Sequence, residues 1–222
     1  MKALLLEGST VLAAFWMTVR LTAISALGSL VLGTLLTAMR VAPLASLRAA
    51  AGCYVTVARN TPLTLVLLFT GLGVGANLGV ELSEDIATNN FWLAVIGLTA
   101  YTSAFVCEAL RSGLNTVPVG QAEAARSLGL GFVQTLGFVT LPQAFRAVVA
   151  PLGGILIALT KNTTIALVVG VSEASVRMRE MIETYGDQVI EIFLGFAGGF
   201  VLLCLPMGLL FGRLAKRMAV AR

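Results

Sequence analysis

The chain has 222 residues, of which 58% are hydrophobic and only 12% charged, and its mean hydropathy is +0.94. A soluble domain carries about 25% charged residues, so this composition excludes a soluble enzyme and a disordered chain and indicates an integral membrane protein. The sequence contains no histidine, its three cysteines form no CxxC pair, and its net charge of +4 is dispersed. It therefore predicts no catalytic residues, no metal site, no disulfide framework and no nucleic-acid partner.

Apolar stretches predict the membrane spans, since a helix needs roughly 20 apolar residues to cross a bilayer. The start of the chain does not predict a signal peptide, because the apolar stretch after Lys2 is short and ends at Glu7. No linker rich in Gly, Pro and Ser divides the chain, so we expect one all-α domain over residues 1–222. The five candidate spans lie at about residues 15–38, 62–80, 91–110, 145–171 and 189–211, the fourth long and interrupted.

The distribution of charge predicts the orientation of these spans. With the amino terminus outside, ten of the fifteen Lys and Arg residues fall in inner segments and nine of the eleven acids in outer segments. Cytoplasmic loops carry an excess of Lys and Arg. The amino terminus is therefore expected outside and the carboxyl terminus inside. The acidic outer loops form a surface that a partner could recognise.

A segment of about 34 residues, at 111–144, separates the third and fourth candidate spans. A loop of that length is uncommon without a function. Good helix formers occupy residues 121–128, and Gly129 suits the left-handed conformation that ends a helix. A second short helix is expected at about 132–139, before Pro142 in the first turn of the next span. The pattern predicts a helix, a break and a second helix.

On the first of these short helices Ala122, Ala125 and Leu128 share one face. Small residues there would let the backbone of another protein approach closely, which favours a docking site for a cytoplasmic protein. The alternative is an amphipathic loop that lies on the lipid headgroups.

The residues of this loop carry a resemblance to a known family. The string EAARSLG at 123–129, then nine residues, then VTLP at 139–142 resembles the EAA loop of ABC importer permeases, EAA-x3-G-x9-I-x-LP. Val139 in place of Ile is the only departure. The resemblance implies coupling helices that sit in a groove of an ATP-binding subunit. It assigns ATPase coupling to Gln121, Glu123, Ala124, Ala125, Arg126, Ser127, Leu128, Gly129, Leu141 and Pro142.

Two further motifs narrow the resemblance. RNTPL at 59–63 is similar to the R-[GN]-T-P-L signature of polar-amino-acid permeases, and KNTT at 161–164 to their K-[DN]-[ST]-[ST] element. The runs GQAEAARSLGLGF, RNTPLTLV and LIALTKNTTIA resemble the glutamate permease subunits of actinomycete-type importers. The resemblance covers nearly the whole chain and implies a type I importer transmembrane domain. Permeases for glutamine and arginine share most of these motifs.

Lys161 lies in the outer half of the fourth candidate span, roughly 24 Å along a helix that begins inside. An ammonium costs at least ~2.5 kcal/mol near a helix centre, so it should face protein or a water-filled cavity. In one interpretation Lys161 attracts the carboxylate of a substrate, and Asn162, Thr163 and Thr164 supply hydrogen bonds to it. In the other, Lys161 extends outward or pairs with an outer acid such as Glu173. The polar run is also expected to mark a break in the helix.

Arg59 and Thr61 lie at the inner mouth of the second candidate span and complete the predicted substrate path. Arg59 would order this mouth or contact the ATPase; alternatively, it anchors the span in anionic headgroups. Thr61 is expected at a helix start. Glu108 and Arg111, three residues apart, are expected to form an ion pair at the membrane edge.

The chain lacks the GxxxxGK[ST] phosphate loop, so no ATPase activity is expected in it. The resemblance implies a permease in a bacterial plasma membrane that binds no cofactor itself. It would work with an ATP-binding subunit that holds ATP and Mg²⁺, an identical or homologous permease, an extracytoplasmic solute-binding protein, an amino-acid substrate and membrane lipid. The alternatives are a permease for glutamine or arginine, or an ion-coupled secondary transporter, which would need an intramembrane acid that the span centres lack.

Overall fold

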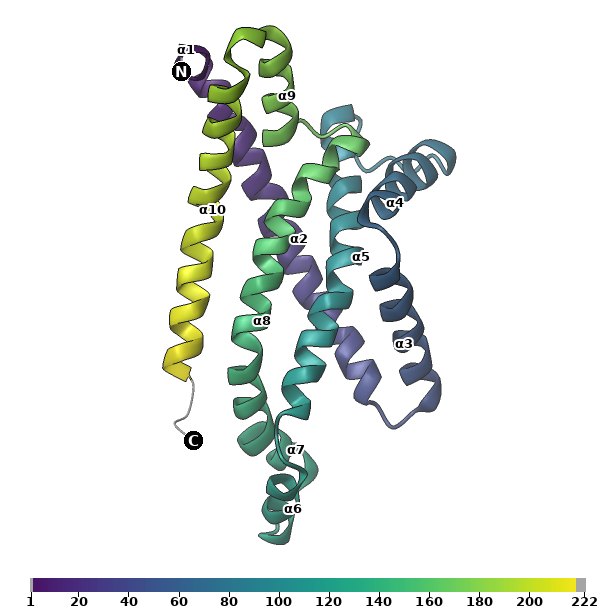
Figure 1. The fold of residues 1–222 in the computed structure, drawn as a ribbon. Coiled ribbons are helices and arrows are strands. Elements are labelled where there is room, and N and C mark those ends of the chain that lie inside the picture. The colour runs from purple at the N-terminus through teal and green to yellow at the C-terminus, as the bar shows by residue number, and fades with distance from the viewer. Residues whose placement is uncertain (1, 219–222) are drawn as a thin grey trace.

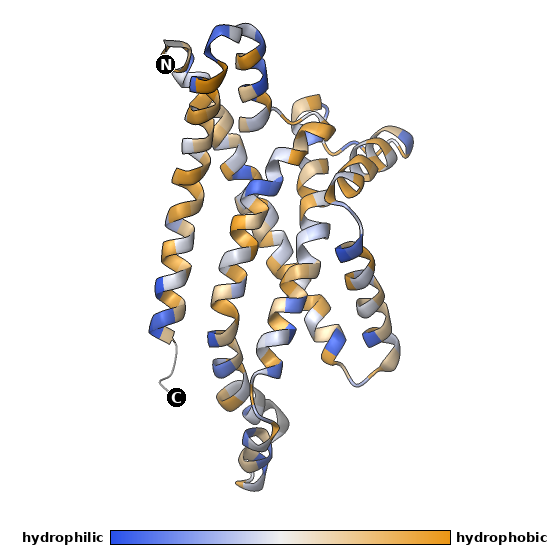
Figure 2. Ribbon diagram, viewed as in Figure 1, coloured by the Kyte–Doolittle hydropathy of each residue, from blue (hydrophilic) through white to orange (hydrophobic). Residues whose placement is uncertain are grey.

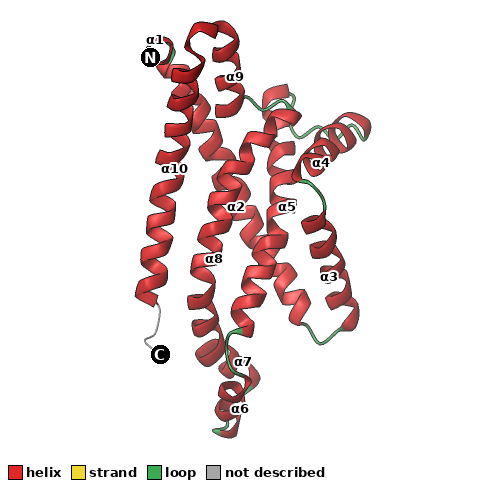
Figure 3. Cartoon of the chain, in the orientation of Figure 1, coloured by secondary structure: helices red, strands yellow, loops and turns green. Residues whose placement is uncertain are grey.

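The computed structural model describes residues 2–218, apart from the side chains of Lys2, Phe132, Val133 and Leu136. Every regular element in that range is helical, which confirms the all-α prediction (Figure 3). The α-helices are α1 (Lys2–Leu6), α2 (Gly8–Val41), α3 (Ala45–Asn60), α4 (Leu63–Leu68), α5 (Ile86–Asn115), α6 (Val119–Ser127), α7 (Phe132–Thr135), α8 (Leu141–Asn162), α9 (Ala174–Thr184) and α10 (Val189–Met218). The π-helices are η1 (Phe69–Asn77) and η2 (Leu136–Thr140), and the 3₁₀-helices are η3 (Thr163–Val169) and η4 (Gly186–Gln188).

Four helical stretches of the described chain are long and apolar enough to cross a membrane: Gly8–Val41, Ile86–Asn115, Gly137–Val169 and Gly186–Met218. They confirm the first, third, fourth and fifth candidate spans. A fifth span exists only if α3 and the stretch Leu63–Asn77, bent by 107° at their junction, count as one.

The predicted second span at 62–80 falls on the stretch Leu63–Asn77, which has the length of a span only together with α3. α3 precedes this stretch, and its arginines and asparagine give it the composition of an inner loop. Thr61 takes an extended conformation before Pro62, as expected because proline disfavours the helical conformation of the residue before it. The helix then restarts as α4, with Pro62 at its N-cap. Thr61 and Pro62 thus end one helix and start the next, which confirms the predicted start there.

Small residues let α2 and α5 pack closely along their length. A β-carbon built on Gly33 would lie 2.6 Å from the side chain of Val106, so only glycine fits this crossing. The hydroxyl of Thr37 donates to the carbonyls of Gly33 and Cys107. Helices in a bilayer gain their stability from such close contact, because lipid is as apolar as the side chains. The core that results joins α2, α4, α5, α8 and η3 around buried leucines such as Leu21, Leu67 and Leu98.

The two ends of the bundle differ (Figure 1). The amino terminus lies with α9 at one end, and α6 and α7 project beyond α5 and α8 at the other, towards which α10 runs. Most of α10 is hydrophobic and its final turns are hydrophilic (Figure 2). The described chain therefore starts and finishes at opposite ends of the bundle.

Candidate functional site

The predicted helix, break and helix at 121–139 is confirmed. Gly129 ends the first helix with φ of +87°, and its N–H donates to the carbonyl of Arg126 at 2.9 Å. Only glycine takes this left-handed conformation without a steric cost. α7 and η2 form the second arm, and η2 leads into α8, with Pro142 in the first turn of that helix. We call the segment Val119–Thr140 the coupling hairpin.

The structure divides the predicted partner-facing side of α6: Ala125 turns inward, while Leu128 stays exposed. Ala125 is buried against the chain's own hairpin, Ala122 is half-buried, and Leu128 is 85% exposed. The hairpin places α6 beside α7 and η2, so the small side chains serve this internal contact. The free surface instead carries the exposed residues Glu123, Ala124, Arg126, Ser127 and Leu128, with Phe138 also exposed on η2.

A hydrogen bond ties α6 to the start of α8. The amide nitrogen of Gln143 donates to Oε1 of Gln121 at 2.6 Å and to the carbonyl of Val139 at 2.9 Å. Leu141 and Pro142 beside it are exposed. The hairpin is thus connected to α8 both by continuous helix and by this side-chain contact. The sequence reasoning missed Gln143, because one glutamine next to a motif carries no distinct signal.

The polar run at 161–164 ends a helix, as predicted. α8 stops at Asn162 and the chain continues as the 3₁₀-helix η3. The hydroxyls of Thr163 and Thr164 donate to the carbonyls of Thr160 and Lys161, each at 2.8 Å. Both hydroxyls therefore already donate a hydrogen bond within the helix end.

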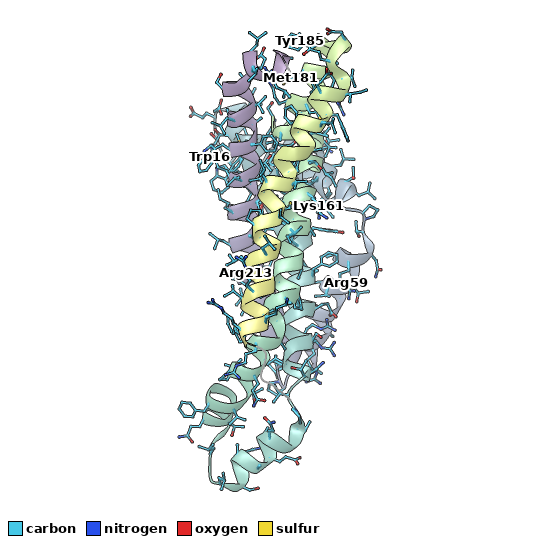
Figure 4. All side chains as sticks on the ribbon, turned by 60° about the vertical axis from the view of Figure 1, so that its left-hand side comes forward. Trp16, Arg59, Lys161, Met181, Tyr185 and Arg213 are labelled. Atoms are coloured by element: carbon cyan, nitrogen blue, oxygen red, sulfur yellow. The ribbon has the colours of Figure 1, made fainter. Side chains whose placement is uncertain are left out.

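The side chains of Lys161 and Asn162 lie in different surroundings, one on the surface and the other at a cavity. Lys161 is exposed and lies nearer than Arg59 to the end of the bundle that carries Tyr185 (Figure 4). Asn162 lines a cavity of about 310 Å³ between α5 and α8. Tyr101, Thr102 and Phe105 line the same cavity from α5. Of the four residues in the polar run, Asn162 is the one that the structure brings to this cavity.

Thr102 is a further polar residue of this cavity that the sequence did not single out. Its side chain is 4% exposed, and Oγ1 has no hydrogen-bond partner among the described residues. Buried polar atoms in folded proteins are nearly always hydrogen-bonded. The Asn162 amide is thus the accessible amide of this cavity, whereas Oγ1 of Thr102 has almost no accessible surface.

The arginine of the RNTPL motif forms an ion pair that was not predicted. Nη1 of Arg59 lies 3.5 Å from Oε2 of Glu108, whose Oε1 contacts Nη1 of Arg40. The expected pair of Glu108 with Arg111 is therefore wrong: the glutamate turns to α2 and α3 rather than along its own helix. Thr61, whose hydroxyl donates to the carbonyl of Val57, lines a second cavity of about 480 Å³ together with Tyr101.

The proposed pairing of Lys161 with Glu173 is also wrong. Glu173 is fully buried at the N-cap of α9, where its carboxylate accepts hydrogen bonds from the backbone of Ser175 and Val176 and from the hydroxyls of Ser175 and Thr18. Burial raises the pKa of this carboxyl above its usual value, against the opposing effect of these hydrogen bonds. Glu173 thus joins α2, α9 and, through the bond from Ser175 to the carbonyl of Thr164, the polar run.

Within the described residues no group of three or more His, Cys, Asp or Glu side chains is arranged to hold a metal ion. The geometry instead combines a projecting hairpin at one end with small cavities between the helices.

Comparison with known proteins agrees with this architecture. Residues 21–220 match the family described as the binding-protein-dependent transport system inner membrane component. The glutamate transport system permease protein GluC of Corynebacterium efficiens is 55% identical over 220 residues, which cover 97% of this chain and 96% of that protein. The probable glutamine ABC transporter permease protein GlnM of Bacillus subtilis is 32% identical and covers 92% of this chain and 91% of its own length.

A solved structure shares the fold over the same extent. The crystal structure of an amino acid ABC transporter with histidines contains a chain that matches with a TM-score of 0.85 at 25% identity, and the match covers 96% of both chains. The all-helical fold, the projecting hairpin and these matches lead to one assignment. The chain belongs to the family of inner-membrane components of binding-protein-dependent transport systems.

Proposed function

We propose that this chain is the transmembrane permease subunit of an ATP-driven importer whose substrate is glutamate. The observation that carries the proposal is the coupling hairpin, which bears the EAA motif, projects from the bundle and continues into α8. The glutamate assignment is supported by the 55% identity to GluC of Corynebacterium efficiens. Glutamine and arginine are the alternative substrates.

In this proposal a separate ATP-binding subunit supplies the energy. That subunit binds ATP and Mg²⁺, and the permease holds no cofactor. Leu128 and the polar residues around it dock in the groove of the subunit, because an exposed leucine at the tip of a hairpin gains free energy when it is buried. Movement of the docked hairpin reaches α8 through η2 and through the bond between Gln121 and Gln143.

The same proposal sets the topology and the other partners. The hairpin end faces the cytoplasm and the α9 end faces outward, in accord with the excess of Lys and Arg in inner segments. The solute-binding protein docks on the outer end, where Glu183, Asp187 and Glu191 are exposed. A second permease, identical or homologous, completes the path across the membrane.

The proposed substrate path runs past the two cavities. Asn162 supplies hydrogen bonds in the first cavity, beside which Arg59 lies over the ring of Phe105, and Thr61 lines the second. Lys161 supplies a positive charge that attracts an anionic amino acid to the outer half of the path.

Uptake of labelled glutamate in a deletion strain, with unlabelled glutamine, aspartate and arginine as competitors, tests the substrate. We expect uptake that depends on the co-expressed ATP-binding subunit, and glutamate as the strongest unlabelled competitor. Stronger competition by glutamine or arginine would reassign the substrate. Uptake that persists without the ATP-binding subunit would contradict the permease role and support an ion-coupled transporter.

A further inference from the structure

Glu108 on α5 lies between two arginines that come from two other helices. Its Oε1 contacts Arg40, near the end of α2, and its Oε2 lies 3.5 Å from Arg59, near the end of α3. We call these three residues the Glu108 triad. Ionisable side chains in a membrane-spanning bundle are costly, and they commonly mark the path of a substrate or ion. The triad is therefore a candidate part of the path.

The two arginines of the triad are not equivalent. Arg40 is the more shielded, with 19% of its side chain exposed, and it is hydrogen-bonded to the carboxylate. Arg59 is 46% exposed, and its 3.5 Å contact is longer than the 2.7–2.9 Å of a charge-assisted hydrogen bond. Two arginines and one glutamate also leave one positive charge unbalanced. Arg59 is therefore the member that can accept a second carboxylate.

Arg59 also lies next to the cavity that Asn162 lines. Its guanidinium carbon is 5.9 Å from the ring centroid of Phe105, and Phe105 lines that cavity. A guanidinium presents a planar fork of N–H donors that matches the two oxygens of a carboxylate. An anion that leaves the cavity along α5 towards Glu108 would meet Arg59.

We propose that Glu108 is a built-in competitor for Arg59: it pairs with the guanidinium until the carboxylate of a transported amino acid replaces it. This rests on the proposed transport function. The exchange replaces one carboxylate with another, so the Arg59 guanidinium keeps a counter-ion throughout. Arg40 holds Glu108 in place when Arg59 moves to the substrate. A substrate without a spare carboxylate displaces Glu108 less well, so the triad favours anionic amino acids.

Direct binding of labelled glutamate to the purified importer, without its solute-binding protein, tests this exchange. Arg59→Gln should weaken binding by about tenfold, as loss of a charge-assisted hydrogen bond does. Glu108→Gln should tighten binding by a similar factor, because the competitor is gone. The double variant should behave like Arg59→Gln. Arg20→Gln is the matched control, since Arg20 also stacks on a phenylalanine, Phe91, and it should leave binding unchanged.

The opposite signs of the two effects separate exchange from a purely structural role. If the triad only holds α2, α3 and α5 together, both substitutions should weaken binding and lower the melting temperature of the complex. That result, or no measurable binding by any of the proteins at millimolar glutamate, would overturn the inference. If Arg59→Gln fails to assemble, Arg59→Lys keeps the charge without the fork and should still weaken binding.

A failure of this inference would be distinct from a failure of the proposed function. An importer that takes up glutamate with ATP but shows effects of the same sign would leave the transport role intact. An unaltered importer that takes up no glutamate would contradict the substrate assignment itself.

Discussion

Two polar segments interrupt the apolar chain, and the structure uses them differently. The coupling hairpin exposes Glu123, Arg126 and Leu128, so these three side chains are available to a partner. The run at 161–164 sits within the bundle, and its two threonine hydroxyls donate to the backbone beside them. A polar motif can therefore serve as a docking surface only where the fold projects it. Inside the bundle the same residue types first end a helix.

The largest effect should come from Gly129, where the hairpin turns. Gly129→Val forces a β-branched residue into a left-handed conformation, at a cost of about 1–2 kcal/mol. That cost corresponds to roughly tenfold in the population of the docking geometry. We expect glutamate uptake in reconstituted vesicles to fall accordingly, while membrane insertion stays normal. Gly120→Ala is the control, since a β-carbon at Gly120 meets nothing within 4 Å. Equal uptake by both variants would contradict a role for this turn.

Leu128 should have the next largest effect, confined to the partner contact. Full burial of a leucine side chain contributes about 1.5–3 kcal/mol, and alanine keeps the β-carbon in the contact, so Leu128→Ala should weaken the affinity for the ATP-binding subunit by about fivefold. The melting temperature of the permease should not change, because Leu128 is 85% exposed. Leu82→Ala, at the other end of the bundle, is the control. Affinity measured by titration of the purified subunits checks this, and an unchanged value would place the contact elsewhere.

Lys161 should have a smaller effect, because it is exposed to solvent or lipid rather than enclosed. Lys161→Ala should reduce glutamate uptake by only a few-fold, because a solvent-screened charge contributes at most about 1 kcal/mol of interaction energy. Uptake rates for glutamate and glutamine, measured in parallel, check whether the loss is specific to the anion. If the substitution leaves the uptake rates of both glutamate and glutamine unchanged, Lys161 only extends to the membrane interface.

Glu173 should give the smallest effect, on stability alone. Because burial raises the pKa of this carboxyl, the folded state binds its proton more tightly than the unfolded state does. Its contribution to stability is therefore greatest below the usual glutamate pKa and declines as the pH rises through the raised value. Glu173→Gln should remove this contribution and so flatten the decline of the melting temperature as the pH rises from acidic to neutral. A variant with the same pH profile as the unaltered protein would contradict this.

Much of this fold could be predicted from the lengths of the apolar stretches and from the glycine and proline residues at helix ends. Four spans and the hairpin follow from such local signals, because a helix satisfies its own backbone and glycine alone tolerates the turn at 129. The second span could not be predicted in the same way. α3, which precedes it, is too polar to be recognised as part of a span, and only its packing against α2 and α5 reveals its place.

The features of the candidate site also fall into those that the sequence predicts and those that only the structure reveals. The sequence by itself determined the family resemblance, the helical class and the docking loop, since these depend on residue type and spacing. Only the tertiary structure decided that Glu108 pairs with Arg40 and Arg59, that Glu173 caps α9, and that Thr102 joins Asn162 at one cavity. These contacts join residues far apart in the chain, so they depend on how the helices cross, and that depends on side-chain packing rather than on any local pattern.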